Sequence, residues 1–526
     1  MRRIRTGRAG AIAAAVAVAV PAVIAGTAGT AAADAGSLTV TTLNREGAKV
    51  TSWMTVTSLT PHAGDGVHEY QSGWPVTLAP GQYAVVTRID DNGLNAQDGP
   101  STLAAQIVTV ADSAPTALTL DARQGKPLRV ALDTPPGASY VQSIAARMCV
   151  AGVNDDFETT TGTRPTGGVY VIPTDDPQTR LGYHATWSSA TQKEVWDVSG
   201  AIAPTGDPIT VPRASLGTVD VKASTGPSSL NTQTAPLESD TQGTGCDQKL
   251  GTPNSFTKLP FEKVLHVSPG SWKFTLDTWH YDTTVAAGAT TALDFGRAVW
   301  GPTRYLPFVQ KGELGFFTSG LVADPKAAGA DITINATATL YRDGKAVVTR
   351  TGLGNSPSAK GPSTFWAPIS TSAAYTLKVH GYRHAAGVPQ PAGMMSTGTD
   401  VAFSFHAGPT SDAVPPAFLT RFLPNGLDPY NHLPAGHAAS IPLTLDRTST
   451  QAGVPMWPST AKKVEVFGST DGGRSWHALT VSHTGGGWTA ALPAQHAGAE
   501  LSLSARVTDV GGNQTVTSVY RAFTVA

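Results

Sequence analysis

Short runs of alternating apolar and polar residues recur along almost the whole chain. Val, Thr, Leu and aromatic residues dominate these runs, which is typical of strands that bury one face. Pairs such as Asn92–Gly93 and Asp471–Gly472 separate the runs and suit the tight turns between strands. The segment Val141–Val150 is the one candidate for a short helix after the Ala-rich start. Strands are predicted at 37–43, 83–89, 117–120, 463–467 and 501–507.

This density of short strands and turns predicts an all-β fold, with several immunoglobulin-like β-sandwich domains in series. About 490 residues remain after the first 35, which corresponds to three to five domains at about 100 to 200 residues each. The boundaries predicted from composition are 36–123, 124–267, 268–407, a Pro-containing linker at 408–416, and 417–526.

The first 35 residues read as a secretory signal peptide. Arginines cluster within the first eight residues, Ala11–Ile24 is an apolar run too short to span a membrane comfortably, and small residues follow. Cleavage is expected after Ala33 or Ala35, with Ala35 favoured. No later stretch approaches 18 uncharged apolar residues, so we expect a secreted, extracellular protein without a membrane span.

Several ordered strings in the second half resemble a known non-catalytic region. The resemblance is to the β-rich segment that follows the catalytic domain in exported subtilisin-like serine proteases of actinomycetes. That family's Asp, His and Ser catalytic strings do not occur in this sequence, so the resemblance implies a role outside the protease chemistry. The strings are 337–345, 375–379, 419–423, 507–513 and 521–523.

The first and last domains each carry a further resemblance. The segment Leu78–Val86 is similar to a strand edge of transthyretin-like and carboxypeptidase-regulatory-like domains, which implies a seven-stranded module without an active site. The strands and turns after 417 resemble immunoglobulin-like or fibronectin type III-like modules appended to exported hydrolases. Such modules serve as spacers, stabilise the protein or present another part of it, and they seldom catalyse a reaction.

The sharpest local motif, at 469–476, is an Asp box. Ser469, Asp471, Gly473 and Trp476 fit the Ser/Thr-x-Asp-x-Gly-x-Ser/Thr-Trp pattern position by position. In proteins that carry this box, the Asp side chain caps backbone donors of a hairpin turn and the Trp packs beneath it. Sialidases repeat the box around a propeller, whereas this sequence has it once. We therefore interpret it as a structural element, with a glycosidase as the alternative.

Cys149 and Cys246 are the two cysteines of the chain. In an oxidising exterior, such a pair favours a disulfide over two free thiols. A nucleophilic cysteine is the alternative, and it would need a histidine close in space.

Candidate metal ligands occur in three places. His380 and His384 lie four apart on a predicted strand and could approach a metal with a third ligand, although a surface pair is the favoured interpretation. Two oxygen-rich turns could hold calcium, and solvated turns are the favoured interpretation there. No cofactor is predicted beyond this calcium alternative. The turns comprise Asp90, Asp91, Asn92, Asn95 and Asp98, and Asn154, Asp155, Asp156 and Glu158.

The charge balance restricts the partners. Charged residues make up 14% of the chain and the formal net charge is -1, so the sequence offers neither a basic stripe for nucleic acid nor a polybasic patch for anionic lipid.

No catalytic residue is predicted, and the leading hypothesis is a secreted accessory module that binds a protein or a cell-wall polysaccharide. Two alternatives stay open: a secreted glycosidase or peptidase with an unrecognised site, and an inhibitor or folding partner of a separate protease.

Overall fold

A computed structural model gives the fold of this chain. It describes residues 36–59, 67–93, 99–150, 159–160, 168–189, 191, 193–203, 206–225, 234–241, 255–276, 279–326, 328–329, 334–354, 361–383, 393–447, 454–485 and 487–526. The described residues form strands β1 to β39 and two 3-10 turns, η1 (Ala122–Gln124) and η2 (Arg213–Ser215). No helix among them could cross a membrane. The predicted signal peptide lies outside the described residues.

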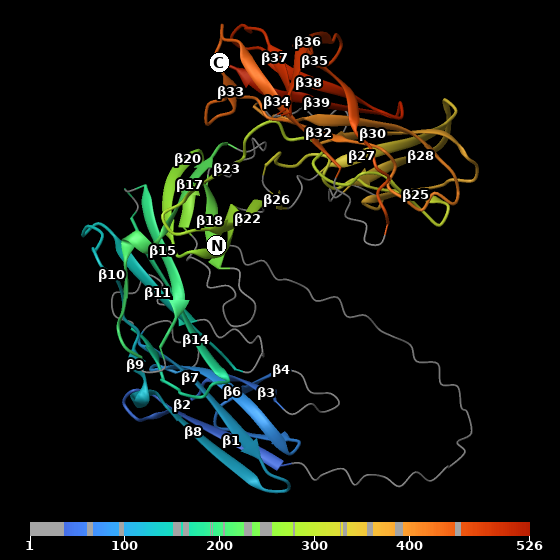
Figure 1. Cartoon of the computed structure of the whole chain (residues 1–526). Coiled ribbons are helices and arrows are strands. Elements are labelled where there is room, and N and C mark those ends of the chain that lie inside the picture. Colours follow the sequence, from blue (N-terminus) through green and yellow to red (C-terminus); the bar gives the residue numbers. More distant parts are fainter. Residues whose placement is uncertain are drawn as a thin grey trace, which may run out of the picture.

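The prediction of an all-β chain of sandwiches is confirmed, and Figure 1 shows the strands gathered in two lobes. The first lobe comprises residues 36–295 together with the short strand β26 (Ala328–Gly329), and the second lobe comprises the rest of 296–526. One local prediction is wrong: Val141–Val150 is a strand, β11, paired with β14 along its full length. Ala146, Met148 and Val150 lie in a core, and the pairing with β14 decides the structure of this segment.

The first sandwich packs sheet A against sheet B. Sheet B is covered on both faces: Val85 and Ile89 of β6 point into the core shared with sheet A, while Ala84 and Val86 join the next core along the chain. Sheet A contains β1 (Gly36–Leu43), β2 (Lys49–Val50), β5 (Pro75–Leu78) and β8 (Pro115–Asp121); sheet B contains β3 (Trp53–Ser58), β4 (Val67–Gln71), β6 (Gly81–Asp90), β7 (Ser101–Val110), β9 (Lys126–Pro127) and β13 (Val169–Val171).

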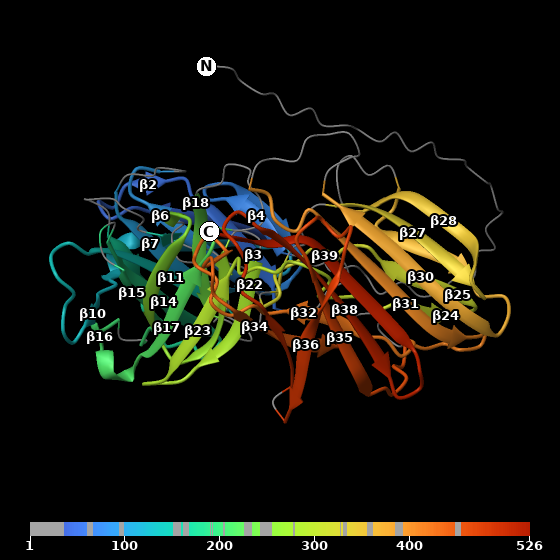
Figure 2. The ribbon, with the colours of Figure 1, turned by 90° about the horizontal axis from the view of Figure 1, so that it is seen from above.

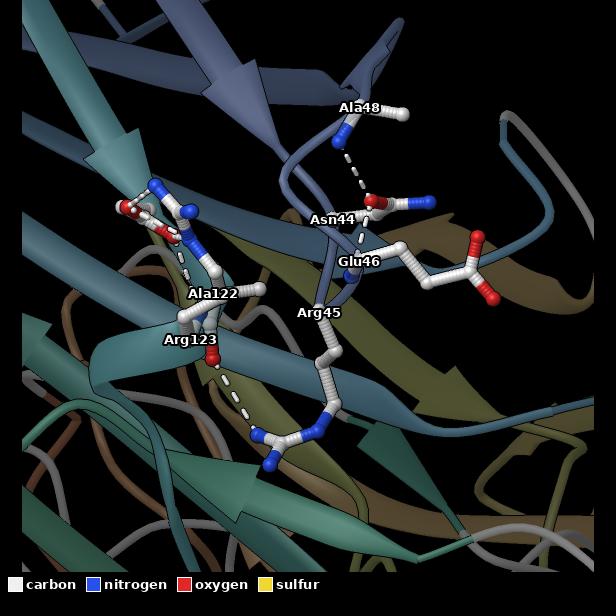
Figure 3. Close-up of polar contacts among 7 residues, drawn as sticks. Asn44, Arg45, Glu46, Ala48, Ala122 and Arg123 are labelled. Carbon is white, nitrogen blue, oxygen red and sulfur yellow. Dashed lines mark hydrogen bonds and ion pairs between the residues drawn. The ribbon is translucent and has the colours of Figure 1, made fainter.

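A turn between β1 and β2 fastens this sandwich to the following segment (Figure 3). Asn44 closes the turn by accepting two backbone N–H groups through its Oδ1. Arg45 Nη1 donates to the carbonyls of Ala122 at 3.1 Å and Gly125 at 3.2 Å. The same guanidinium lies 3.6 Å from the ring centroid of Tyr170 in β13. One side chain therefore joins β1, η1 and β13.

Sheet D runs through two further sandwiches of the first lobe. Its β11, β14 and β15 cover sheet B, and its β20, β17 and β23 pack against sheet E. Sheet D contains β11 (Val141–Val150), β12 (Thr159–Thr160), β14 (Thr179–Ser188), β15 (Glu194–Ala201), β17 (Gly217–Ala223), β20 (Phe261–Val267) and β23 (Thr290–Phe295); sheet E contains β18 (Thr234–Thr241), β19 (Ser255–Lys258), β21 (Gly270–Leu276), β22 (Trp279–Val285) and β26 (Ala328–Gly329); the two-stranded sheet C pairs β10 (Val130–Leu132) with β16 (Ile209–Val211).

The second lobe is built on one long sheet, sheet G, which serves two sandwiches. Phe316 of the small sheet F meets Phe403 of sheet G with ring centroids 5.6 Å apart. Sheet F contains β24 (Phe308–Gln310), β25 (Glu313–Phe317) and β29 (Thr364–Pro368). Sheet G follows the order β28 (Lys345–Gly354), β27 (Asn335–Arg342), β30 (Ala373–Tyr382), β31 (Gly398–Ala407), β39 (Gln514–Val525), β38 (Glu500–Asp509), β35 (Ala461–Ser469), β36 (His477–Thr484), β37 (Gly487–Leu492), β34 (Ala439–Asp446) and β32 (Leu419–Phe422), with β33 (His432–Leu433) beside β39.

Asn431 joins the two lobes. Its side chain is fully buried, and its backbone takes a φ of 62°, a conformation that asparagine tolerates better than most residues. Its Nδ2 donates to the carbonyls of Thr225 at 3.2 Å and Gly296 at 2.9 Å, and its Oδ1 accepts from the Ala298 N–H at 2.9 Å. The bond to Thr225 attaches the last sandwich to the first lobe, and Gly296 and Ala298 follow directly after the junction between the lobes.

Replacing this asparagine, Asn431→Ala, should lower the free energy of unfolding by at least about 2 kcal/mol, because buried backbone groups lose their partners. Chemical denaturation of the full chain measures the loss. Asn425→Ala is the matched control, since the exposed Asn425 makes one side-chain hydrogen bond, to Ser440. Equal losses for the two variants would contradict the assigned role of Asn431.

Candidate functional site

The two sandwiches of the second lobe meet along a strand pair that we call the seam. Strand β31 of one sandwich pairs antiparallel with β39 of the other, from Gly398 opposite Tyr520 to Ser404 opposite Gln514. Figure 2 shows β38, β39, β31, β30 and β27 following one another across this junction. The side chains on the outer face therefore stand on one continuous hydrogen-bonded surface.

A bulge with two extra residues interrupts β39 at the seam. Leu501 pairs with Phe523 and Leu503 with Val519, so Ser502 alone faces the three residues 520–522. Arg521 has a φ of 52°, in the left-handed region that non-glycine residues rarely occupy. Bulges of this kind redirect side chains and are common beside functional sites.

Hydrogen bonds hold the bulge on both sides. The Arg521 N–H donates to Ser502 Oγ at 3.0 Å, and its carbonyl accepts from the Ser396 N–H at 2.7 Å. Ser396 is also left-handed, with a φ of 48°, and is fully buried. The Thr397 N–H donates to the Tyr520 carbonyl at 3.1 Å. Two strained residues thus support one another, which points to a constrained site.

A groove lies over the seam, and we call it the seam groove. Its larger part, of about 580 Å³, lies between the bulge and the turn of the Asp box. A smaller part, of about 280 Å³, crosses the outer faces of β27, β30 and β31 and reaches β39. The two parts meet at His380, which lines both. Volumes in this range suit a small ligand or part of a chain.

A polar cluster lies where the two parts meet. His380 Nδ1 is 2.6 Å from Asp400 Oδ1, and the Tyr520 hydroxyl donates to Asp400 Oδ2. The hydrogen bond to Asp400 raises the pKa of His380 against the opposing effect of burial. Burial raises the pKa of Asp400, but the bonds from His380 and Tyr520 outweigh it and leave that pKa below its usual value. Burial and the neighbouring carboxylate raise the pKa of Tyr520.

The Asp box forms the turn between β35 and β36 at one wall of the groove. Asp471 Oδ1 accepts from the Ser469 hydroxyl at 2.7 Å and from the backbone N–H groups of Arg474 and Ser475, each at 3.0 Å. Its Oδ2 accepts from the Ser475 hydroxyl at 2.5 Å. These bonds, with the Ser475 hydroxyl first, hold the pKa of Asp471 far below its usual value.

The same turn packs against the bulge. The Trp476 ring lies beside the Tyr520 ring, with centroids 6.3 Å apart. Gly473 has a φ of 85°, and a Cβ there would stand 2.6 Å from the Tyr520 ring. Glycine at this position therefore allows both the turn and the close approach to Tyr520.

Charged side chains of both signs line the larger part of the groove. Arg521 Nη2 is 2.7 Å from Glu500 Oε1, while Arg521 Nε is buried without a hydrogen-bond partner among the described residues. Arg474 is exposed at the rim. The site therefore presents donors and acceptors side by side.

The structure separates the other predicted site residues from this groove. His380 bonds Asp400, whereas His384 lies outside the described residues, and no group of three or more metal-ligating side chains occurs in the described segments. Cys246 and the side chain of Cys149 also lie outside the described part, so the disulfide stays a prediction. The same holds for the second oxygen-rich turn, 154–158, and for Asn95 and Asp98.

The described carboxylates of the first oxygen-rich turn bind protein groups. Asp90 accepts from Arg88 at 2.8 Å and from the Ser101 hydroxyl at 2.5 Å. Asp91 Oδ1 accepts the Arg45 N–H at 3.0 Å. These bonds assign both carboxylates to local structure, and calcium there stays a prediction.

Sequence reasoning named the Asp box and His380 but missed Asp400, Tyr520 and the bulge as parts of one site. Asp400 and Tyr520 lie 120 positions apart, and no local motif links them. The string from Arg521 to Phe523 belongs to the family resemblance, but the sequence does not show that Arg521 has a left-handed backbone conformation.

Comparisons with known proteins identify no family. No family model matches the sequence, and no curated protein matches it. Solved structures give distant likenesses: the Bacillus anthracis TIE protein (9% identity, TM-score 0.13, 50% of this chain and 50% of that one), a streptococcal ancillary pilin (9%, 0.13, 50% and 98%) and Escherichia coli alpha-2-macroglobulin activated by porcine elastase (10%, 0.12, 93% and 53%). This chain spans about half the length of the first and third of these. Likenesses with such scores carry no argument about function.

The Asp box should hold the wall of the groove in place. Asp471→Ala removes the acceptor of the Arg474 and Ser475 N–H groups, so their amide hydrogens should exchange faster with solvent. Hydrogen exchange followed by mass spectrometry on peptides covering 470–476 measures this, and peptides from β27 should be unchanged. Unaltered exchange in the box would contradict the capping role.

The seam should weaken as pH rises through the folded pKa of His380. The folded pKa of His380 is raised above the unfolded value of about 6.5. The stability that His380 contributes is therefore fully present below about pH 6.5 and is lost as pH rises above the folded pKa. Melting temperatures of wild type and His380→Gln should therefore differ at low pH and converge at high pH. His437→Gln, at an exposed ring bonded to the Ala435 carbonyl, is the control. A constant difference across this range would contradict the assignment.

Proposed function

We propose that this chain is an exported, non-catalytic binding module that holds an extracellular ligand in the seam groove. The observation that carries the proposal is the strained bulge at 520–522, which is held by Ser396, Thr397 and Ser502 beside an open groove. Backbone strain of this kind persists only where the surroundings enforce it, and it is concentrated at ligand sites.

The form of the groove supports binding rather than catalysis. The carboxylate of Asp471 is occupied by four hydrogen bonds within its own turn, and Asp400 is held by His380 and Tyr520. A general acid or base needs a group free to exchange a proton with the substrate, and these two carboxylates are held by protein groups instead. Rigid, occupied side chains instead provide a fixed surface, which keeps the entropy cost of binding low.

The sequence resemblance supports an extracellular location and an accessory role. Strings within β27, β30, β32 and β38–β39 are those that resemble the non-catalytic region of exported subtilisin-like proteases, and the first 35 residues resemble a signal peptide. We therefore place the protein outside the cell, as an accessory module that engages a polymer of the cell wall or medium.

A retention assay tests this function. Immobilised residues 36–526 should retain material from the cell-wall fraction of the producing cells, and Arg474→Ala should reduce retention by about tenfold, because the exposed guanidinium lies at the rim of the groove. Arg129→Ala, an exposed arginine of the first lobe, is the matched control. Equal retention by wild type and both folded variants would place binding elsewhere and refute the seam groove as the site.

A further inference from the structure

We propose that the ligand of the seam groove is an uncharged oligosaccharide; this inference rests on the proposed function and specifies its ligand. Three properties of the groove point to this class: its charge balance, its outward-facing rings and the absence of an open strand edge beneath it.

The charges lining the groove cancel. Its lining carries three fixed positive charges, on Arg474, Arg521 and Lys378, and three negative charges, on Asp471, Asp400 and Glu500. Arg521 is paired with Glu500, and His380 with Asp400. A groove selective for a polyanion or a basic peptide would carry an excess of one sign, because such an excess attracts the ligand. Sugar hydroxyls both donate and accept, so an adjacent guanidinium and carboxylate suit them.

Aromatic rings stand along the floor of the groove. His380 and Tyr382, two apart on β30, lie with ring planes 24° from parallel and centroids 5.6 Å apart. Tyr341, on β27, lines the far end, where Lys378 Nζ is 5.0 Å from its ring centroid. Tyr341 faces Thr376 across the strand pair, six residues from Tyr382, which corresponds to about 20 Å of strand. Flat apolar sugar faces stack on such rings, and this spacing suits a chain of several sugars.

An extended peptide would find no backbone partner here. Strand β27 is paired with β28 and β30, β30 with β27 and β31, and β31 with β30 and β39. Peptides that bind as an added strand require unpaired backbone groups at a sheet edge. The floor of the groove is the middle of a sheet, so recognition must come from side chains, as it does for glycans.

The test measures binding of the purified full mature chain to separate probes by calorimetry. Uncharged hexasaccharides of glucose, N-acetylglucosamine and mannose form one set, a polygalacturonate oligosaccharide is the acidic probe, and unfolded casein peptides are the peptide probe. We expect at least one uncharged hexasaccharide to bind, and Tyr382→Ala to raise its Kd by about tenfold or more. Tyr382→Phe, which keeps the ring, should bind like wild type.

The outcomes distinguish a wrong ligand class from a wrong binding site. If Tyr382→Ala does not fold, Tyr341→Ala at the far end of the groove replaces it with the same expectation. Binding of the acidic or peptide probe alone would overturn the inference. So would an uncharged probe that binds the folded alanine variants as tightly as it binds wild type. Failure of all probes would also overturn it. The retention assay with Arg474→Ala would still decide whether the seam groove binds at all.

Discussion

The pairing of β31 with β39 is the interaction on which the second lobe depends. Without it, two sandwiches would be joined by loops and free to move against each other, as neighbouring domains usually are. With it, a single sheet crosses the junction from Gly398 and Tyr520 to Ser404 and Gln514. The buried residues on either side then form one core, from Phe403 through Val401 to Val519. A groove placed over this pair keeps its shape, because moving either wall would break strand hydrogen bonds.

The rigid sheet holds strained backbone in place at the bulge. Left-handed backbone at Ser396 and Arg521 costs about 1 to 3 kcal/mol at each residue, and an isolated loop would relax. Here the surrounding structure fixes both positions, because Ser502 accepts from the Arg521 N–H and the Arg521 carbonyl accepts from the Ser396 N–H. The turn of the Asp box adds a second restraint through Trp476 against Tyr520. A motif that resembles a purely structural element thus contributes one wall of the candidate site.

Local patterns predicted much of the strand content. The runs at 37–43, 83–89 and 501–507 fall within β1, β6 and β38, because a strand with one buried face has a period of two whatever its partners are. The same rule did not identify the strand at Val141–Val150. Ala and Arg at 145–147 are compatible with a helix or a strand, and the pairing with β14 makes the segment a strand. Domain boundaries remain predictions from composition.

The bulge could not have been predicted from that periodicity. Residues 520–522 face Ser502 alone, so β39 carries two extra residues, and an even insertion leaves the alternation of buried and exposed positions unchanged. Val519 and Phe523 therefore both point into the core, on either side of the interruption. The partners of the site are equally hidden, since His380, Asp400 and Tyr520 meet only after three strands have paired in register. Sequence can locate such residues one by one, whereas the sheet register decides which of them form a common surface.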